Sequence, residues 1–279
     1  MAYDVRPPIP QPGQDFDSPL SAAVAERDRE TLDLVRRALD DRNVILAFQP
    51  VVQARQPQRV AFHEGLVRVL DPTGRIIPAG DFMGAVETSE LGRRIDCLAL
   101  EMGLIALRRD PTIRMSVNMS ARSIGYPRWN ETLRDGLRGD ASVAERLILE
   151  ITESSAMLMP DIVTVFMGDL QRQGISFALD DFGAGFTAFR YLREFFFDIV
   201  KIDGQFIRGI SGDVDNQVLA EALVTIGKHF DMFTVAESVE SADDANCLAA
   251  IGVDCMQGYF FGAPSTLPPW RLPDGQKSA

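Results

Sequence analysis

Residues 175–203 read ISFALDDFGAGFTAFRYLREFFFDIVKID, and this stretch decides the fold. An apolar run at Ile175–Asp181 ends in two acids and is followed by a glycine-containing turn. A helical stretch over residues 187–195 comes next, and a second apolar run at Asp198–Asp203 completes the segment. Strand, helix and strand in immediate succession are typical of a βαβ unit, in which the two strands run parallel. The segment therefore predicts an α/β protein.

The same alternation extends along most of the chain. Helical stretches are expected at residues 80–109, 128–139, 160–173, 187–195, 213–230 and 241–251. Eight strands are expected at Val44–Val52, Arg59–Leu70, Arg114–Met119, Arg146–Thr152, Ile175–Asp181, Asp198–Asp203, Met232–Glu237 and Val253–Gln257. Eight strands with alternating helices in about this length indicate a (β/α)8 TIM-like barrel. Only Gln53–Gln58 separates the first two strands, which is too short for a parallel crossover, so we expect the first strand to be antiparallel.

The regions outside the barrel have a different composition. Residues 1–19 are rich in proline with scattered acids, and such a segment cannot bury enough surface to fold, so it is predicted to be a disordered tail or linker. Ser18 or Ser21 could cap a helix that runs to about Arg42. The barrel is expected over residues 20–270, and a flexible C-terminal tail over 271–279.

Composition excludes several classes of function. The chain has 279 residues, and 40 acidic against 28 basic side chains give a net charge of −12, which argues against binding to a DNA or RNA polymer. The three cysteines form no pairing or zinc spacing and are expected to be buried thiols. No apolar stretch is long enough to span a membrane, and the N-terminus lacks a signal-peptide pattern. We therefore expect a soluble cytoplasmic protein.

Polar side chains lie in or at the end of seven of the eight expected strands. Active-site residues of such barrels come from the carboxyl ends of the strands, so these side chains are expected to meet at one rim. Any one of them alone is more simply interpreted as an ordinary strand-end polar residue, but chance explains the whole set poorly. Gathered carboxylates repel one another unless cations lie between them, which points to divalent metal ions. The residues are Glu64, Asn118, Glu150, Asp180, Asp181, Lys201, Glu237 and Gln257.

The pair Asp180-Asp181 is the sharpest local signal. Adjacent strand residues point to opposite faces, so both can serve one site only where the strand ends and the chain turns. Residues 182–185 supply such a turn, and their glycines permit close approach of a ligand. A plain glycine-rich turn capped by Thr187 would explain the glycines but not the doubled acid. Two such acids suggest a two-metal site, with ions about 3.5–4 Å apart, that acts on a phosphoryl group.

Two cationic side chains have open alternatives. Arg68 shares a strand face with Glu64, so it could bind a phosphate through its planar fork or form an internal salt bridge with Glu64. Lys201 lies in an otherwise apolar strand, where it either pairs with a carboxylate or has a lowered pKa and transfers protons. Both histidines, His63 and His229, are interpreted as structural.

Together these residues resemble the EAL-domain family of cyclic di-GMP phosphodiesterases. The similarity runs from Gln49 to Tyr259, nearly all of the expected barrel. Its motifs stand in order as EGLVR at 64–68, VNMS at 117–120, LEITES at 149–154, DDFGAG at 180–185, KID at 201–203 and AESVE at 236–240. Six motifs in the family's order make the resemblance specific.

The resemblance implies a role for each matching residue. Glu153 would hold the loop after Asp181, which in this family lies at a dimer interface, so a homodimer is expected. Lys201 would help to activate the attacking water, with Glu64 and Glu237 as further catalytic residues. Gln49, Arg68 and Gln257 would contact the cyclic dinucleotide. Two Mg²⁺ or Mn²⁺ ions would be held by Glu64, Asn118, Glu150, Asp180, Asp181 and Glu237.

Three positions depart from the family's pattern. Gly65 is the middle residue of the signature triplet, where it lacks the methyl group of the family's residue. Its position alternates away from the metal face, so the change should affect packing or local rigidity and not chemistry. Ala184 replaces a threonine in the turn, and Ser238 replaces a glycine beside Glu237, where it is expected to shift the backbone. Because no ligand is deleted, the leading hypothesis is metal-dependent hydrolysis of cyclic di-GMP to linear pGpG. The alternative is a catalytically weak or silent cyclic di-GMP receptor that signals through a partner.

Overall fold

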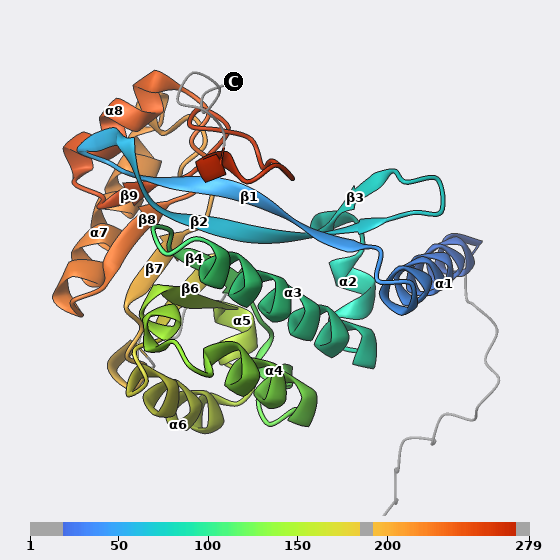
Figure 1. Ribbon diagram of the computed structural model, residues 1–279. Coiled ribbons are helices and arrows are strands. Elements are labelled where there is room, and N and C mark those ends of the chain that lie inside the picture. The colour runs from blue at the N-terminus through green and yellow to red at the C-terminus, as the bar shows by residue number, and fades with distance from the viewer. Residues whose placement is uncertain (1–18, 185–191, 272–279) are drawn as a thin grey trace, which may run out of the picture.

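The computed structural model describes residues 19–184 and 192–271, and within them the chain forms a closed eight-stranded barrel surrounded by helices (Figure 1). The strands are β1 (Val44–Gln53), β2 (Gln56–Leu70), β3 (Ile76–Pro78), β4 (Met115–Asn118), β5 (Leu147–Thr152), β6 (Ser176–Phe182), β7 (Ile199–Ile202), β8 (Phe233–Ala236) and β9 (Cys255–Met256). The main helices are α1 (Pro19–Asp40), α2 (Met83–Val86), α3 (Glu90–Arg109), α4 (Pro127–Leu137), α5 (Glu153–Ala156), α6 (Pro160–Gln171), α7 (Val214–His229) and α8 (Ala242–Ile251).

The ring closes through the first two strands, as the sequence predicts. The strand order is β1-β9-β8-β7-β6-β5-β4-β2, and β2 pairs with β1 to complete the circle. β1 runs antiparallel to both of its neighbours, whereas the pairs from β2 through β4 to β9 are parallel. Ala54 and Arg55 form the whole connection between β1 and β2, so an antiparallel pair is the only arrangement that the chain permits. The predicted TIM-like barrel with an antiparallel first strand is confirmed.

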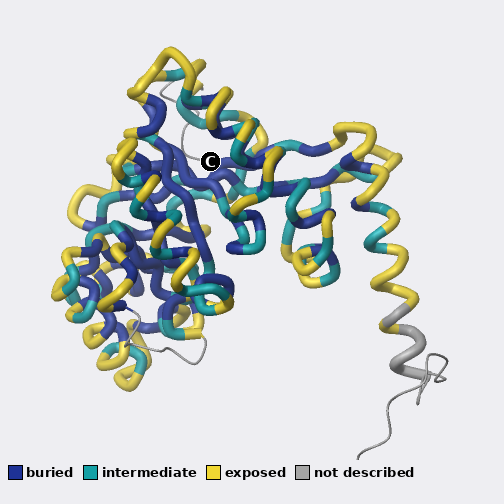
Figure 2. Tube along the Cα trace, turned by 90° about the horizontal axis from the view of Figure 1, so that it is seen from below, coloured by how far each residue is buried: buried dark blue, intermediate teal, exposed yellow. Residues whose placement is uncertain are grey.

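An apolar layer fills the middle of the barrel. Inward-facing side chains of different strands pack together there, as expected for a barrel of this size. Figure 2 shows the strands as the most deeply buried part of the chain. This layer closes the barrel interior below the polar rim. Its members are Val51, Phe62, Ile148, Ala178, Ile199 and Val235.

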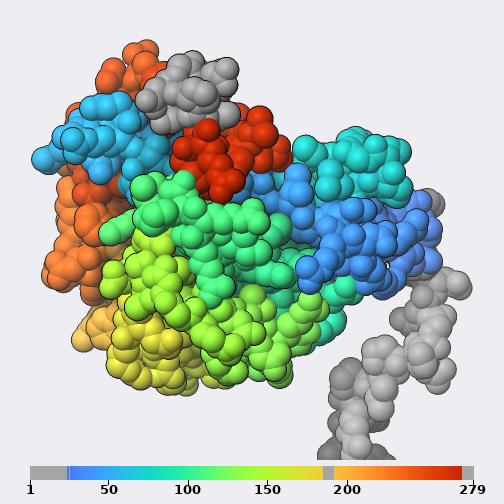
Figure 3. Space-filling view, in the orientation of Figure 1, coloured from blue at the N-terminus to red at the C-terminus, as the bar shows by residue number. Residues whose placement is uncertain are grey.

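A C-terminal segment covers the outer face of β1 and β2, where no crossover helix is available. Ser265 forms an antiparallel bridge with Phe48. The Trp270 ring lies with its centroid 4.8 Å from that of Phe48 and 4.7 Å from that of His63. In the space-filling view this segment lies against the strand pair (Figure 3). Burial lowers the pKa of His63 to about 4, so His63 is a neutral, structural residue.

The structure differs from the expected elements in a few places. The expected helix 80–109 is divided into a 3₁₀ turn at Ala79–Asp81, helix α2 and helix α3. The division occurs because the Ser89 hydroxyl accepts a hydrogen bond from the Leu91 amide and so starts a new helix. The three-residue strand β3 was not expected. Most of the expected helix 187–195 lies outside the described residues. So do the expected tails at 1–19 and 271–279, except for Pro19, which begins α1, and Arg271, which ends a 3₁₀ turn at Pro269–Arg271.

Three further features concern helix α1, the cysteines and the length of the helices. Helix α1 already begins at Pro19, and its buried residues Val35, Ala38 and Leu39 pack on the core. All three cysteines have free thiols. Among the described residues, we find no helix with the length and apolar character needed to cross a membrane.

Candidate active site

Lys201 lies at the centre of four carboxylates at the carboxyl ends of the strands. Its Nζ atom is 2.7 Å from Glu237 Oε1, 2.8 Å from Glu150 Oε2, 3.1 Å from Asp180 Oδ1 and 3.3 Å from Glu64 Oε2. The lysine side chain is only 1% exposed. The five residues come from β7, the residue after β8, β5, β6 and β2. The barrel therefore brings together side chains that are up to 173 residues apart in the sequence, from Glu64 to Glu237.

The charge of Lys201 is fixed by these neighbours. Burial alone would lower its pKa, but the negative charges of Asp180, Glu150, Glu237 and Glu64 outweigh burial and raise the pKa well above its usual value. Of the two alternatives for this lysine, the structure shows the paired ammonium and not a lysine with a lowered pKa.

One ammonium group does not balance four carboxylates. Burial and the charge of Glu64 raise the pKa of Glu150 to about 8, even though Lys201 opposes the shift. Burial likewise raises the pKa of Glu237 well above its usual range. Burial also disfavours the charged form of Glu64, but Lys201 and hydrogen bonds from Gln257 and Asn118 outweigh it, so its pKa is lowered. The site thus carries more negative charge than Lys201 can stabilise, and it would be relieved by further positive charge.

The second acid of the pair, Asp181, reaches the same site through a distortion of the strand. The pairing of β6 with β7 shifts register between Leu179 and Phe182, and Asp181 has a φ of 56°. This left-handed conformation turns the chain so that Asp180 and Asp181 can face one site. Carboxylate oxygens of Asp180, Asp181 and Glu237 lie within 4.8 Å of one another. Burial and the charge of Asp180 raise the pKa of Asp181 to about 6.

These oxygens fit a divalent cation. Glu150 Oε1 is buried without a hydrogen-bond partner, and Asp180 Oδ1 has only its ion pair with Lys201. The Asn118 amide nitrogen donates to Glu64 Oε1 over 2.9 Å, which leaves the Asn118 carbonyl oxygen as its possible metal ligand. All six predicted ligands are carboxylate or amide groups, and hard cations such as Mg²⁺ and Mn²⁺ prefer such oxygen donors. An excess of negative charge and unpartnered oxygens are what such an ion would satisfy.

The turn after the acid pair is anchored from β5. Glu153 follows that strand and is buried, and its Oε2 atom accepts a hydrogen bond of 3.2 Å from the Gly183 amide. Gly183 has a φ of 93°, and a Cβ at this position would lie 2.7 Å from the Phe206 ring, so only glycine fits. Ala184 is exposed, and its amide donates to Asp181 O over 3.1 Å. This hydrogen bond from the Gly183 amide is the kind of contact by which Glu153 would hold the turn.

A cavity of about 320 Å³ opens directly above Lys201. Gln257 lies between Gln49 and Glu64, because its amide nitrogen donates to Gln49 Oε1 over 3.1 Å and to Glu64 Oε2 over 2.6 Å. The Gln49 amide nitrogen in turn donates to Gly262 O. Both polar ends of Gln49 are therefore used within the protein, whereas the carbonyl oxygen of Gln257 has no partner among the described residues.

Arg68 lies on the wall of this cavity and does not form the internal salt bridge that was its alternative. Its guanidinium donates to Val67 O over 2.9 Å and forms no ion pair with any residue that the structure describes. Partial burial lowers its pKa, although the charges of Glu64 and Tyr259 oppose this shift. Arg68 therefore keeps hydrogen-bond donors available for an anion in the cavity.

Four further polar side chains line the cavity and were not predicted to belong to the site: Arg208, Ser238, Glu240 and Tyr259. Ser238 and Glu240 follow Glu237 directly, and Tyr259 follows Gln257 by two positions, so their neighbours in the sequence gave a weak indication. Arg208 lies in the connection from β7 to α7, where no local pattern marks it.

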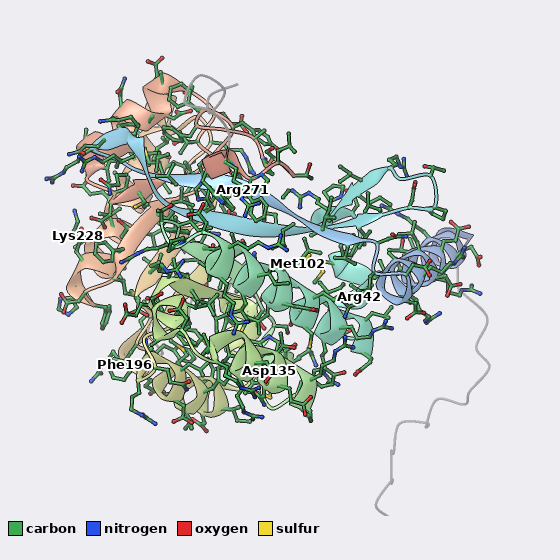
Figure 4. The ribbon with its side chains drawn as sticks, viewed as in Figure 1. Arg42, Met102, Asp135, Phe196, Lys228 and Arg271 are labelled. Carbon is green, nitrogen blue, oxygen red and sulfur yellow. The ribbon has the colours of Figure 1, made fainter. Side chains whose placement is uncertain are left out.

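A larger cavity of about 760 Å³ opens at the opposite end of the barrel. It is lined by residues from the beginnings of the strands and by Lys228, labelled in Figure 4 at the end of α7. The apolar layer of Val51, Phe62 and their neighbours separates it from Lys201. Because the carboxylates converge at the other end, chemistry is assigned to the smaller cavity.

The comparisons with known proteins agree with this geometry. The family model described as the EAL domain matches residues 33–264. The chain is 30% identical over 256 residues to the bifunctional diguanylate cyclase/cyclic di-GMP phosphodiesterase MucR of Pseudomonas aeruginosa, covering 89% of this chain and 37% of MucR. It is 28% identical over 237 residues to the cyclic di-GMP phosphodiesterase PdeB of Shewanella oneidensis, covering 84% of this chain and 28% of PdeB. The chain thus spans about a third of the length of these relatives.

A solved structure agrees as well. The structure of the PaMucR phosphodiesterase in complex with c-di-GMP matches with a TM-score of 0.76 at 29% identity, over 85% of this chain and 97% of that chain. The match covers nearly the whole of that chain.

Proposed function

This chain belongs to the EAL domain family, and we propose that it hydrolyses cyclic di-GMP to linear pGpG. The observation that carries this proposal is the complete cluster of four carboxylates around Lys201, joined by Asn118 and Asp181, at the mouth of the barrel. Two relatives with this domain are named as cyclic di-GMP phosphodiesterases. The cavity above the cluster contains Arg68, which suits an anionic substrate.

The cluster would hold two Mg²⁺ or Mn²⁺ ions. Asp180, Asp181 and Glu237 form one group of converging oxygens, and Glu64, Asn118 and Glu150 supply the remaining donors. When bound, the ions would lower the pKa of a coordinated water and offset negative charge on the phosphate.

The protein's own side chains would position the reactants. Arg68 would bind a phosphate oxygen of the dinucleotide by charge-assisted hydrogen bonds. Lys201 is an ammonium group held by its carboxylate partners, and its charge would help to activate the attacking water by stabilising the negative charge that develops on it. The water oxygen forms a bond to phosphorus and releases a proton to solvent, and the bond from phosphorus to the ribose 3′ oxygen breaks as that oxygen takes up a proton from solvent. Glu64 and Glu237 lie on either side of Lys201 and would orient the water.

A direct experiment tests this function. Purified protein with Mg²⁺ or Mn²⁺ is expected to convert cyclic di-GMP to linear product, which chromatography separates. Glu64→Ala is expected to lose at least about 10²-fold in turnover, because it removes a ligand and unpairs Gln257 and Asn118. Binding without any product under both metals would instead support the receptor alternative, and neither binding nor product would reject both.

A homodimer is part of the same proposal. Leu158, just before α6, is 53% exposed, and Ile162 and Val165 on α6 are 50% and 66% exposed; all three follow closely after the helix that carries Glu153. Exposed apolar side chains gathered on one element are typical of a protein interface. Light scattering is expected to give twice the mass of the chain, and Val165→Lys is expected to reduce it to the monomer.

A further inference from the structure

Ser238, next to Glu237, has an unusual backbone conformation. Its φ is 56°, a left-handed value that glycine adopts freely and serine adopts at a cost of about 1 kcal/mol. The residue stands where the family's pattern has a glycine. Because this conformation is unfavourable for serine, a local contact of the Ser238 side chain should account for it.

The side chain of Ser238 makes one specific contact. Its Oγ accepts a hydrogen bond of 3.1 Å from Arg208 Nη2. The Nε atom of the same guanidinium is 3.8 Å from Glu240 Oε1. Arg208 therefore contacts two residues that follow Glu237 after the end of β8.

Gly204 provides the space for this contact. A Cβ at Gly204 would lie 2.4 Å from Ser238 Oγ and 2.7 Å from Ser238 Cβ, which no real structure tolerates. The Gly204 backbone does not have a positive φ, so space and not conformation is what favours glycine here. The segment after β7 therefore packs closely against the segment after β8, with Gly204 leaving the space that the Ser238 side chain occupies.

Arg208 complements Arg68 across the cavity. Arg68 comes from β2 and Arg208 follows β7, and these strands are four places apart in either direction around the eight-stranded ring. The third cation of the cavity wall, Lys201, is already surrounded by carboxylates. Arg208 is 60% exposed and keeps donors for a ligand. A cyclic dinucleotide carries two phosphate groups, so a cationic side chain on each side of the mouth matches its charge.

We propose that Arg208 is a substrate-binding residue that contacts the anionic dinucleotide on the side opposite Arg68, with Ser238 as its positioning residue. This inference rests on the proposed function, because the cyclic dinucleotide is taken from it. The serine hydroxyl fixes the guanidinium over the cavity, and Glu240 restrains it from the other side.

Steady-state kinetics and calorimetric binding of cyclic di-GMP test this inference. Arg208→Gln is expected to raise KM and Kd about tenfold, the usual loss for one charge-assisted contact, with kcat changed by less than about twofold. Ser238→Gly is expected to raise KM about threefold. The double variant is expected to equal Arg208→Gln alone, because the serine acts only through the arginine. Arg134→Gln, an exposed arginine on α4, is the matched control and is expected to leave KM unchanged.

Gly204→Ala gives an independent check. The added methyl group is expected to displace Ser238 and to press on Arg208, because its Cβ would lie 2.4 Å from Ser238 Oγ and 3.2 Å from Arg208 Nη2, so KM should rise at least as much as in Ser238→Gly. In a Ser238→Gly background its further effect is expected to be smaller, because only the contact with Arg208 remains of the three nearest ones. Urea unfolding of each variant confirms that the fold is kept.

The outcomes separate the two proposals. If the wild-type protein turns over the substrate and Arg208→Gln keeps the wild-type KM and Kd, this inference is wrong and the proposed function stands. If the wild-type protein only binds, the proposed hydrolysis is wrong, and the Kd values still decide the role of Arg208. If it neither binds nor hydrolyses the dinucleotide, both proposals are rejected.

Discussion

Replacing Lys201 with methionine gives the most direct test of how the site is held together. Methionine keeps most of the volume but removes the charge, so the surrounding carboxylates lose the one cation within 3.3 Å of all four. Glu150 is fully buried and cannot be solvated in place of the lost partner. Removing one partner of a buried ion pair costs about 3–5 kcal/mol. The free energy of unfolding should fall by this amount at pH 8 without divalent ions, out of about 5–15 kcal/mol for a typical domain.

Two conditions should reverse part of this loss. At pH 5.5 the buried carboxylates can take up protons, so the deficit of the variant should shrink. Added Mg²⁺ should also restore stability, because bound cations would replace the missing charge, and a concentration one hundred times the Kd contributes about 2.7 kcal/mol. The wild-type protein should gain less from Mg²⁺ if Lys201 already neutralises part of the cluster.

Urea unfolding followed by tryptophan fluorescence measures these differences, since the buried Trp129 reports on the core. The series compares both pH values, with EDTA and with Mg²⁺. Lys228→Met is the control, because it makes the same substitution at an exposed lysine. If Lys201→Met is as stable as the wild-type protein at pH 8 in EDTA, the carboxylates are not held by this lysine and the electrostatic account is wrong.

Three further predictions follow from the same geometry. Between pH 6.5 and 8 the metal-free wild-type protein should become less stable, because the folded state keeps a proton on Glu150, whose pKa is raised to about 8, that the unfolded chain has released. The lowered pKa of His63 makes stability rise with pH, but only below about pH 6.5. An unfolding temperature that rises from pH 6.5 to 8 would therefore contradict the raised pKa of Glu150. Glu153→Ala should raise the Mg²⁺ concentration for half-maximal turnover about tenfold, since Gly183 loses its anchor; an unchanged metal titration would exclude that role. Gly65→Ala should change the free energy of unfolding by less than about 1 kcal/mol and leave turnover unaltered, because its Cβ would meet Leu46 Cδ1 and Ser116 O at 3.3 Å on the face away from Lys201.

The barrel could be predicted because its determinants are local and repeated. Apolar runs and helical stretches alternate with a regular spacing, and the connection between β1 and β2 is too short for any pairing except an antiparallel one. The elements that were missed depend on tertiary contacts. Ile76–Pro78 becomes a strand only because the long strand β2 extends far enough to pair with it. The break between α2 and α3 depends on one capping serine within a stretch of helix-forming residues.

The convergence of the site's side chains could be predicted, but their contacts with one another could not. Strand-end position was enough to expect Glu64, Glu150, Asp180, Lys201 and Glu237 at one rim, because parallel strands end on the same side of a barrel. The sequence left the state of Lys201 open, since its pKa depends on four charges from other strands. It also gave no sign that Gln257 joins Gln49 to Glu64. Arg208 was missed because its contact with Ser238 joins two loops that only the folded barrel brings together.

The position of the apolar layer explains why such a cluster can exist at all. Four carboxylates within reach of one ammonium repel one another, and a flexible segment would separate them. Here each is attached to a different strand of a closed ring, and directly beneath them Val51, Phe62, Ile148 and their neighbours pack the interior. The hydrogen-bonded ring prevents the strands from moving apart, so the burial of this layer offsets the electrostatic cost above it. The negative charge that destabilises the cluster is the same charge that would bind the cations. An arrangement of these acids with less mutual repulsion would bind the cations less tightly.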